Sequence, residues 1–242
     1  MRKEIIETNY KQSFSDKKNR ETEYFFTVVI CTFNRDKLIG RALQSLVEQK
    51  YRDFEVIVVD DGSTDQTFGV VKKFREKLNL RYIYQQNKGL SVARNVGGFS
   101  ANGEYITFLD SDDEYLPKHL LSRYEILTQD RSIQFLYGGI QIVGNEYVPD
   151  ANDPTNLIHL SECVVGGTFF IKKELFIKLN GFNQLKYGDD YDFYKRVLQE
   201  KVKIAKVDFP TYVYYRNTED SICNTLINKR KSKNAQEKNA PK

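Results

Sequence analysis

Ile106-Thr107-Phe108-Leu109-Asp110-Ser111-Asp112-Asp113 decides the fold, because an apolar run ends there at a cluster of three carboxylates. Short apolar runs bounded by turn signals are typical of buried strands. The carboxylates then lie where a strand leaves the sheet, which is the edge at which open α/β sheets hold ligands. Like charges this close repel unless a cation or hydrogen bonds compensate, and hard oxygen ligands suit Mg²⁺ or Mn²⁺ bridging substrate phosphates. The alternative is that Asp112 and Asp113 cap the next helix, since Asp is a preferred N-cap residue.

Composition restricts the kind of site that this chain can build. Its 242 residues include two histidines, His119 and His159, and three scattered cysteines, Cys31, Cys163 and Cys223. We therefore expect neither a zinc site of histidine and cysteine nor a disulfide framework, so any metal must be held mainly by oxygen atoms. The cysteine usage fits a reducing cytoplasm. No apolar run approaches the roughly 20 residues of a membrane-spanning helix, and the first residues lack the apolar core of a secretory signal.

Strands alternate with helices in the first half of the sequence, which indicates parallel βαβ units with right-handed crossovers. The expected strands are 25–31, 54–59, 81–84 and 106–109. The expected helices are 35–49, one from Ser63 or Thr64 to about 78, one opened by Ser91, and one from Pro117 to about 128. Strand-rich segments follow at 133–143, 163–171 and 202–216, with a helix at 190–200. The fold class is therefore α/β, with a Rossmann-like, mostly parallel sheet flanked by helices and a mixed second half.

The turn after the first strand excludes two common phosphate-binding loops. It reads Cys31-Thr32-Phe33-Asn34-Arg35, without a dinucleotide fingerprint and without a Gly-Lys-Ser/Thr loop. Phosphates are therefore not held there by a glycine-rich nest. A metal at Asp110 and Asp112 would take over that role.

Two further motifs offer polar groups to a nucleotide. Asp60-Asp61-Gly62-Ser63-Thr64-Asp65 ends the second strand, and a carboxylate there can accept hydrogen bonds from a nucleobase or a ribose. A turn with an N-cap explains Gly62 and Ser63 but does not need two adjacent acids. The run from Asn87 to Asn95 brings the cations Lys88 and Arg94, although a solvent-facing Lys88 is the simpler interpretation of that residue.

Two glycine-containing motifs lie in the second half. Gly166-Gly167 permits close approach of a ligand to the backbone. Gly188-Asp189-Asp190 opens a helix with paired acids. The helix dipole stabilises carboxylates at that position, which is a purely structural explanation, and a positioned carboxylate is also what a general base requires.

Taken in order, these motifs closely resemble those of the inverting family-two glycosyltransferases with the GT-A fold. The resemblance covers about residues 25–223. The segments that carry it are 28–35, 58–65, 86–89, 93–95, 109–113 and the Gly-Asp-Asp at 188–190. Each segment alone is a modest signal, and their order and spacing together are very specific.

The resemblance implies a transferase that uses a nucleotide-diphosphate sugar, with a UDP-sugar favoured, and Mg²⁺ or Mn²⁺. It implies that Asp112 contacts the metal, that Asp110 contacts the metal or the ribose, and that Asp60 or Asp61 binds the base or ribose. Asp190 matches the acid that deprotonates a hydroxyl acceptor, which is a saccharide, lipid-linked or protein-linked. The remaining donor-binding candidates are Thr32, Asn34, Arg35, Lys88, Arg94 and Ser111.

The sequence departs from the family pattern at two places. Asp189 stands where the family usually has Glu, and it joins Asp190 as a catalytic candidate. The family often shows Tyr-Arg-x-His near the C-terminal strand, whereas this chain reads Tyr215-Arg216-Asn217-Thr218. The missing His leaves open which residue contacts the diphosphate on that side.

Three rival functions follow from parts of the same pattern. A nucleotidyltransferase that makes a nucleotide sugar would share the sheet but would carry a Gly-rich, basic loop after the first strand. A haloacid-type phosphatase would use the first Asp of an Asp-x-Asp near the start of the chain, and Asp110 lies far from it. An inactive sugar-nucleotide binding protein would not need Asp110, Asp112 and Asp190 together.

The terminal segments differ from the rest in composition. We expect a polar extension at 1–23 and a single GT-A domain at 24–227. The nucleotide-sugar half of that domain covers about 24–115 and the acceptor half about 116–227. Residues 228–242 form a flexible basic tail. Such a tail is either a solvated end or a contact with anionic lipid at the inner face of the cell membrane, and we expect no nucleic-acid partner.

Overall fold

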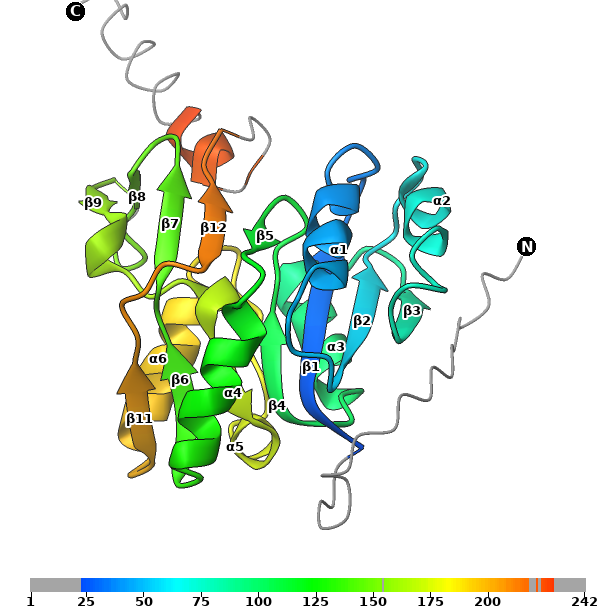
Figure 1. Ribbon diagram of the computed structural model, residues 1–242. Coiled ribbons are helices and arrows are strands. Elements are labelled where there is room, and N and C mark those ends of the chain that lie inside the picture. The colour runs from blue at the N-terminus through cyan, green and yellow to red at the C-terminus, as the bar shows by residue number, and fades with distance from the viewer. Residues whose placement is uncertain (1–22, 154, 218–220, 222, 229–242) are drawn as a thin grey trace, which may run out of the picture.

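The computed structural model describes residues 23–153, 155–217, 221 and 223–228. Its centre is a seven-stranded sheet in the order β11-β6-β10-β4-β1-β2-β3 (Figure 1). These strands are β1 (Tyr24–Thr32), β2 (Phe54–Asp60), β3 (Leu80–Tyr84), β4 (Gly103–Phe108), β6 (Ile133–Tyr137), β10 (Phe170–Lys172) and β11 (Lys203–Lys206). β10 runs antiparallel to β4 and β6, and the other pairs are parallel. The predicted α/β class with a mostly parallel sheet is confirmed.

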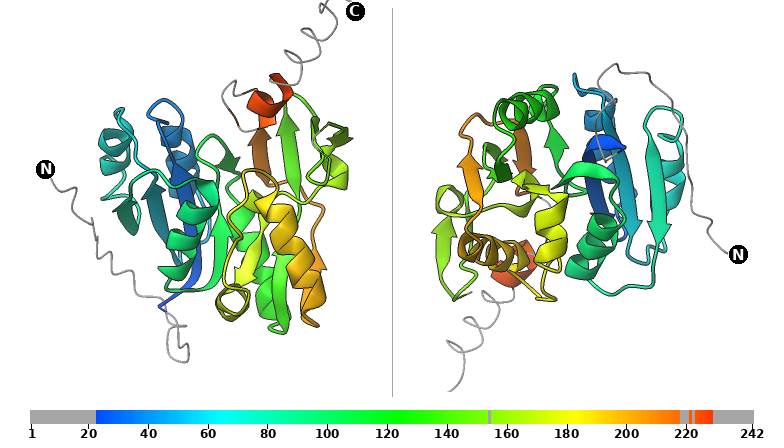
Figure 2. Two further views of the ribbon diagram at one scale, coloured as in Figure 1. Left: turned by 180° about the vertical axis from the view of Figure 1, so that it is seen from behind. Right: turned by 90° about the horizontal axis from the view of Figure 1, so that it is seen from below.

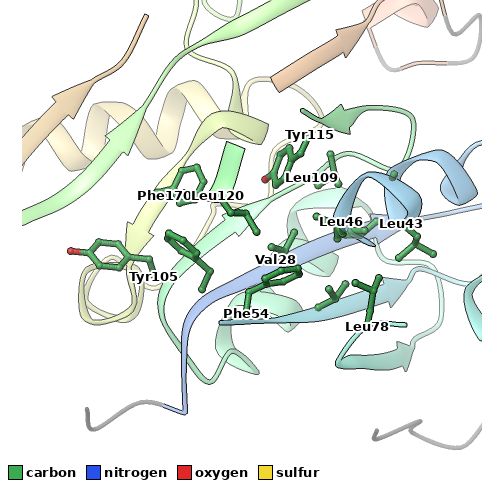
Figure 3. Packing of buried hydrophobic residues seen from close by; sticks show 14 of the residues in the cluster. Val28, Leu43, Leu46, Phe54, Leu78, Tyr105, Leu109, Tyr115, Leu120 and Phe170 are labelled. Carbon is green, nitrogen blue, oxygen red and sulfur yellow. The ribbon is translucent and has the colours of Figure 1, made fainter. Parts of the chain in front are cut away.

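Helices cover both faces of this sheet (Figure 2). They are α1 (Ile39–Val47), α2 (Thr67–Lys72), α3 (Leu90–Phe99), α4 (His119–Gln129), α5 (Lys173–Lys178) and α6 (Asp189–Gln199). Successive side chains of a strand point to opposite faces, so Val28 packs with α1 and α4 while Val29 packs with α3, α5 and α6. Figure 3 shows the first of these two clusters.

One helix approaches the sheet more closely than an ordinary side chain would permit. In α3, a Cβ placed on Gly97 would stand 2.3 Å from Cγ1 of Val29. The absence of a side chain at this position lets α3 lie directly against β1. The start of α3 is thereby held at the edge where β1 ends.

A second, three-stranded sheet in the order β5-β12-β7 extends the same edge. Its strands are β5 (Glu114–Tyr115), β7 (Ile140–Val143) and β12 (Tyr212–Tyr215), and beside it lie a hairpin of β8 (Tyr147–Pro149) and β9 (Leu157–His159) and two short 3₁₀ helices, η2 (Leu160–Glu162) and η3 (Gly166–Thr168). The predicted strand-rich segments are therefore more divided than expected. Gly138 and Gly139, with φ of 101° and 80°, break the segment 133–143 into β6 and β7.

Several interpretations of helix starts are wrong, and α1 begins at Ile39 rather than at Arg35. α4 begins at His119 after Lys118, so neither Asp112 nor Asp113 caps it. α2 begins at Thr67 after Gln66, so Ser63 and Thr64 do not cap it either. The hydroxyl of Ser63 instead accepts a hydrogen bond from the backbone N–H of Asn34 at 2.8 Å, which joins the turns after β1 and β2.

The register of the parallel strands brings their carboxyl ends together. Thr32 of β1 pairs with Asp60 of β2, and Val29 of β1 pairs with Phe108 of β4. The turns that follow all three strands therefore open on the same side of the sheet. Apart from Glu23 and Asn228, the predicted extension and tail lie outside the described residues. Among the helices that the structure describes, none has the length and apolar character needed to cross a bilayer.

Candidate active site

A cavity of about 880 Å³ opens at the carboxyl edge of β1, β2 and β4. Its volume is within the range of small-molecule sites. The turns after these strands, the start of α3, η3, the start of α6 and the end of β12 all contribute to its wall. All predicted site residues except Asp60 line it: Thr32, Asn34, Arg35, Asp61, Lys88, Arg94, Asp110, Ser111, Asp112, Asp189 and Asp190.

The two adjacent acids after β2 have different surroundings. Asp60 is completely buried. Its Oδ1 accepts the backbone N–H of Ser63 at 2.7 Å, and its Oδ2 accepts the hydroxyl of Tyr82. Asp61 lies in the cavity wall, where its carboxylate accepts the backbone N–H groups of Lys88 and Gly89, each at 2.8 Å. Asp60 therefore braces the turn, and Asp61 orders the loop that leads into α3.

The turn after β1 presents polar groups to the cavity. The hydroxyl oxygen of Thr32 is buried and has no hydrogen-bond partner within the described part of the chain. Asn34 has a left-handed φ of 52°, and its Oδ1 accepts the backbone N–H of Thr64 at 2.9 Å. Arg35 is half-buried and Lys88 is exposed at the cavity wall. A buried hydroxyl that lacks a partner is costly, so a ligand that bonds to Thr32 would relieve that cost.

The Asp-x-Asp turn after β4 offers two carboxylates to the cavity. The Asp110 side chain is 31% exposed and the Asp112 residue is half-buried, whereas Ser111 is buried. No group of three or more His, Cys, Asp or Glu side chains is arranged to hold a metal ion in the described residues. Two carboxylates nevertheless fit Mg²⁺ or Mn²⁺, because such ions commonly use one or two carboxylates and take their other ligands from substrate phosphates and water.

The third carboxylate of the cluster, Asp113, is fully buried and is directed away from the cavity. Its Oδ2 accepts the hydroxyl of Tyr212 at 2.6 Å, and its Oδ1 accepts the backbone N–H of Tyr215 at 2.8 Å. Burial, followed by the charges of Asp110 and Asp112, raises the pKa of Asp113 well above its usual range. This acid therefore attaches β12 to the Asp-x-Asp turn.

The paired acids at the start of α6 face the cavity from the opposite half of the chain. Asp189 is buried and accepts hydrogen bonds from Arg94 and Ser91. Asp190 accepts the backbone N–H of Gly166 at 3.1 Å through Oδ2 and its neighbour's N–H at 2.8 Å through Oδ1. Burial, followed by the charge of Asp189, raises the pKa of Asp190 to about 6. A carboxylate with this pKa can accept a proton near neutral pH.

Arg216 is a wall residue that the sequence analysis did not assign. It is 2% exposed, its Nε has no partner among the described residues, and Nη2 makes only long hydrogen bonds, to the Tyr147 carbonyl at 3.4 Å and to Asn224 at 3.3 Å. No carboxylate of the described chain pairs with it. Its place in the Tyr-Arg-x-His pattern was the signal that could have identified it. Thr218, which replaces the His, lies outside the described residues.

Comparison with known proteins supplies an independent assignment. A family model described as glycosyl transferase family 2 matches residues 27–184, and a second, described as the N-terminal domain of galactosyltransferase, matches residues 151–219. An uncharacterized glycosyltransferase of Haemophilus influenzae is 30% identical over 219 residues, which are 85% of this chain and 74% of the relative.

Solved structures agree with this assignment. The crystal structure of residues 1–349 of Staphylococcus aureus TarS in complex with UDP-GlcNAc has a TM-score of 0.70 at 27% identity, covering 81% of this chain and 60% of that one. The mannosyltransferase PcManGT from Pyrobaculum calidifontis, solved with GDP-Man and Mn²⁺, has a TM-score of 0.68 at 21% identity over 91% of this chain and 67% of that one, and this likeness shows the fold alone. The predicted GT-A fold is therefore confirmed. With its family model matching well over half of its length, the chain belongs to glycosyl transferase family 2.

Proposed function

We propose that the protein is a metal-dependent, inverting glycosyltransferase that moves a sugar from a UDP-sugar to a hydroxyl acceptor. One observation carries this proposal. The cavity brings the Asp110–Asp112 turn together with Asp190, whose pKa is raised to about 6. In this proposal, the site for the diphosphate leaving group and the general base for the acceptor would share one cavity.

Donor recognition is assigned to the first half of the chain. Asp61 lies in the wall and Asp60 behind it, so Asp61 is the acid that would contact the base or ribose, with Asp60 holding the turn in shape. The buried hydroxyl of Thr32 is a further donor contact. The UDP preference is supported by the relative TarS, which was solved with UDP-GlcNAc.

Diphosphate binding is assigned to the Asp-x-Asp turn and to Arg216. Asp110 and Asp112 would hold the cation, which when bound neutralises the charge that develops on the leaving diphosphate. Arg216 is a buried cation in the same wall without a carboxylate partner in the described residues. A guanidinium suits a phosphate because it donates hydrogen bonds from a planar fork, and this residue would supply the contact left open by the missing His.

Proton transfer is assigned to Asp190. The acceptor hydroxyl gives its proton to this carboxylate while its oxygen attacks the anomeric carbon, and the bond from that carbon to the diphosphate breaks. Attack opposite the leaving group inverts the configuration without a covalent intermediate. The acceptor is a hydroxyl of a saccharide, a lipid-linked or a protein-linked compound, and the basic residues after Asn228 are proposed to contact anionic lipid. A vesicle sedimentation assay with and without those residues tests that contact.

A donor panel tests the assignment directly. Purified protein is incubated with Mn²⁺ and with UDP-, GDP- and dTDP-sugars, and release of the nucleotide diphosphate is measured. We expect release of UDP, abolished by EDTA. Synthesis of a UDP-sugar from UTP and a sugar phosphate would identify a nucleotidyltransferase instead, and binding of UDP-sugars without turnover of any acceptor would identify an inactive binding protein.

A further inference from the structure

Arg94 lies between the two acidic elements of the cavity. It belongs to α3 and is 4% exposed. Its Nη1 donates to both carboxylate oxygens of Asp189 at 3.0 Å, and its Nη2 donates to Oδ1 of Asp110 at 3.3 Å. One guanidinium therefore joins the start of α6 to the Asp-x-Asp turn.

The charge of this guanidinium is already shared by two carboxylates. Burial alone would lower its pKa, but Asp189 and Asp110 outweigh burial and raise the pKa of Arg94 above its usual value. A phosphate that took Arg94 as a ligand would have to replace one of these two partners. The geometry thus favours a bridge within the protein over the role of phosphate ligand that its sequence motif suggested.

Two neighbours of Arg94 on α3 also hydrogen-bond to the first turn of α6 and to the loop before it. The Asn95 side chain donates to the carbonyl of Phe182 at 2.8 Å and accepts the N–H of that residue at 2.7 Å. The hydroxyl of Ser91 lies 3.1 Å from Oδ2 of Asp189. Ser91 and Asn95 therefore hold the loop and the first turn of α6 against α3, whereas Arg94 also reaches the turn after β4.

We propose that Arg94 is a positioning residue that sets the acid pair at the start of α6 relative to the Asp110 turn. The inference rests on the proposed function of Asp190 as the general base. A planar fork can serve two carboxylates at once, whereas the single ammonium of Lys acts as a point charge and cannot reproduce that geometry. In the proposed function Asp110 lies on the donor side of the cavity and Asp190 on the acceptor side. Arg94 therefore fixes the position of the acceptor's base relative to the donor.

A change at Arg94 also alters the charge around Asp190. Among the described residues, the titratable and charged groups that act on Asp190, or on which it acts, include Asp189, Arg94, Cys163, Tyr187 and Cys223. Arg94 is the cation in this set and lowers the pKa of Asp190. Loss of the cation therefore moves the acid limb of the pH–rate profile to higher pH.

Arg94→Lys and Arg94→Gln test the proposal, with Arg196→Lys as the matched control. Arg196 also anchors α6, through Asp192 at 3.0 Å and the carbonyls of Leu179 and Gly181, each at 2.8 Å, but it is not part of the cavity wall. Binding of UDP with Mn²⁺ is measured by calorimetry, and UDP release from the UDP-sugars of the donor panel gives kcat and its pH dependence.

We expect both Arg94 variants to bind UDP within about threefold of the unchanged protein while kcat falls by on the order of 10²-fold, the loss associated with small misplacements of reacting groups. Arg94→Gln should also move the acid limb of the pH–rate profile to higher pH. Arg196→Lys should change neither the UDP affinity nor kcat. Asp189→Asn breaks the same bridge from its other end. The double variant Arg94→Gln/Asp189→Asn should lose no more kcat than the more damaging single variant, because both changes remove the same Arg94–Asp189 ion pair.

Three results would overturn the proposal. If UDP affinity falls far more than kcat, Arg94 is a phosphate ligand. A loss of melting temperature in Arg94→Lys without a change in kcat or pH profile would make the residue merely structural. Additive effects of Arg94→Gln and Asp189→Asn would separate the two residues. Failure of the proposed function is distinguishable, because in that case Asp190→Asn itself keeps its turnover.

Discussion

At the scale of single residues, neighbouring acids in this site have separate tasks because their surroundings differ. Asp113 is buried against β12, and Asp112 is half-buried in the cavity wall. Asp189 is neutralised by Arg94, whereas Asp190 accepts only backbone N–H groups. Burial and an adjacent charge raise a carboxyl pKa, so the second acid of the pair is the one suited to hold a proton.

Asp190→Asn should keep donor affinity and lose turnover by about 10²–10⁴-fold, the usual contribution of a general base. The amide keeps the shape of the side chain but cannot accept the proton. Asp192→Asn is the control, because Asp192 lies two residues further along α6, pairs with Arg196 and does not line the cavity. Initial rates of UDP release and calorimetry with UDP measure the two effects. A product that retains the donor's anomeric configuration, read by NMR, would contradict inversion.

The pH dependence of turnover follows from the raised pKa of the same residue. Asp190 is protonated below its folded-state pKa of about 6 and ionised above it. Since the base acts as the carboxylate, kcat/KM should fall tenfold per pH unit well below about pH 6 and level off above it. Rates between pH 4.5 and 8, with stability checked at each pH, measure the limb. A profile flat down to pH 5 would show that another group takes the proton.

Replacing Asp112, the proposed metal ligand, should weaken the binding of UDP. Asp112→Asn should weaken UDP binding in the presence of Mn²⁺ by about 1.5–3 kcal/mol, the range for losing an interaction with a charged group. EDTA should weaken binding to the unchanged protein and have little further effect on the variant. Calorimetry with UDP, with and without Mn²⁺, measures both quantities. If both proteins bind UDP equally well with and without Mn²⁺, the cation does not bind at this turn.

At the scale of elements, β12 is held in place by a hydrogen bond to an acid. The hydroxyl of Tyr212 donates to Asp113 at 2.6 Å and lies 3.3 Å from the backbone nitrogen of Asp110. Tyr212→Phe should lower the free energy of unfolding by about 1–3 kcal/mol, because it removes the hydrogen bond to Oδ2 of a buried acid, whose Oδ1 keeps the N–H of Tyr215. Tyr124→Phe is the control, since its ring packs on Tyr51 and its hydroxyl makes no hydrogen bond to the described residues. Equal denaturation midpoints for the two variants would contradict this account.

The strands β1, β2, β3 and β4 of the central sheet could be predicted from sequence, and the β5-β12-β7 sheet could not. β1, β2 and β4 are rich in apolar residues and almost wholly buried, which is a strong local signal. β5 has two residues, and β7 and β12 have four each. Their pairing depends on the break at Gly138-Gly139 and on the buried contacts of Asp113, and neither is visible in local patterns. The sequence for the same reason suggested a helix cap for Asp113, where the structure shows a tertiary anchor.

The residues around the cavity were also only partly predictable from the sequence. The motif positions Asp61, Asp110, Asp112 and Asp190 were recognised from sequence, and the structure places all of them in one wall. The difference between Asp60 and its neighbour could not be predicted, because only the fold shows which carboxylate of the doubled acid turns inward to Tyr82. Arg216 was missed because only the structure shows that it is a buried wall residue without a carboxylate partner among the described residues.

At the scale of the whole molecule, the cavity is closed by segments far apart in the chain. Its wall begins at Cys31 and ends at Cys223, and Ser221 and Cys223 are the last contributions. Asn224 holds Arg216 through two hydrogen bonds of 3.3 Å. Nη2 of Arg216 donates to Oδ1 of Asn224, and the Asn224 amide donates to the Arg216 carbonyl. The segment just before Asn228 therefore forms and supports part of the cavity wall, and no described wall residue comes after Cys223.

Two truncations separate these regions. A chain ending after Asn228 should release UDP from the donor at the unchanged rate, because every described wall residue remains. A chain ending after Asn217 should bind UDP with Mn²⁺ less tightly, by roughly 1–3 kcal/mol, since Arg216 loses the partner that orients it and two wall residues are gone. Circular dichroism confirms that both chains fold, and calorimetry measures the affinity. Loss of turnover in the longer chain would place residues 229–242 in the site, and unchanged affinity in the shorter one would remove Arg216 and its support from diphosphate binding.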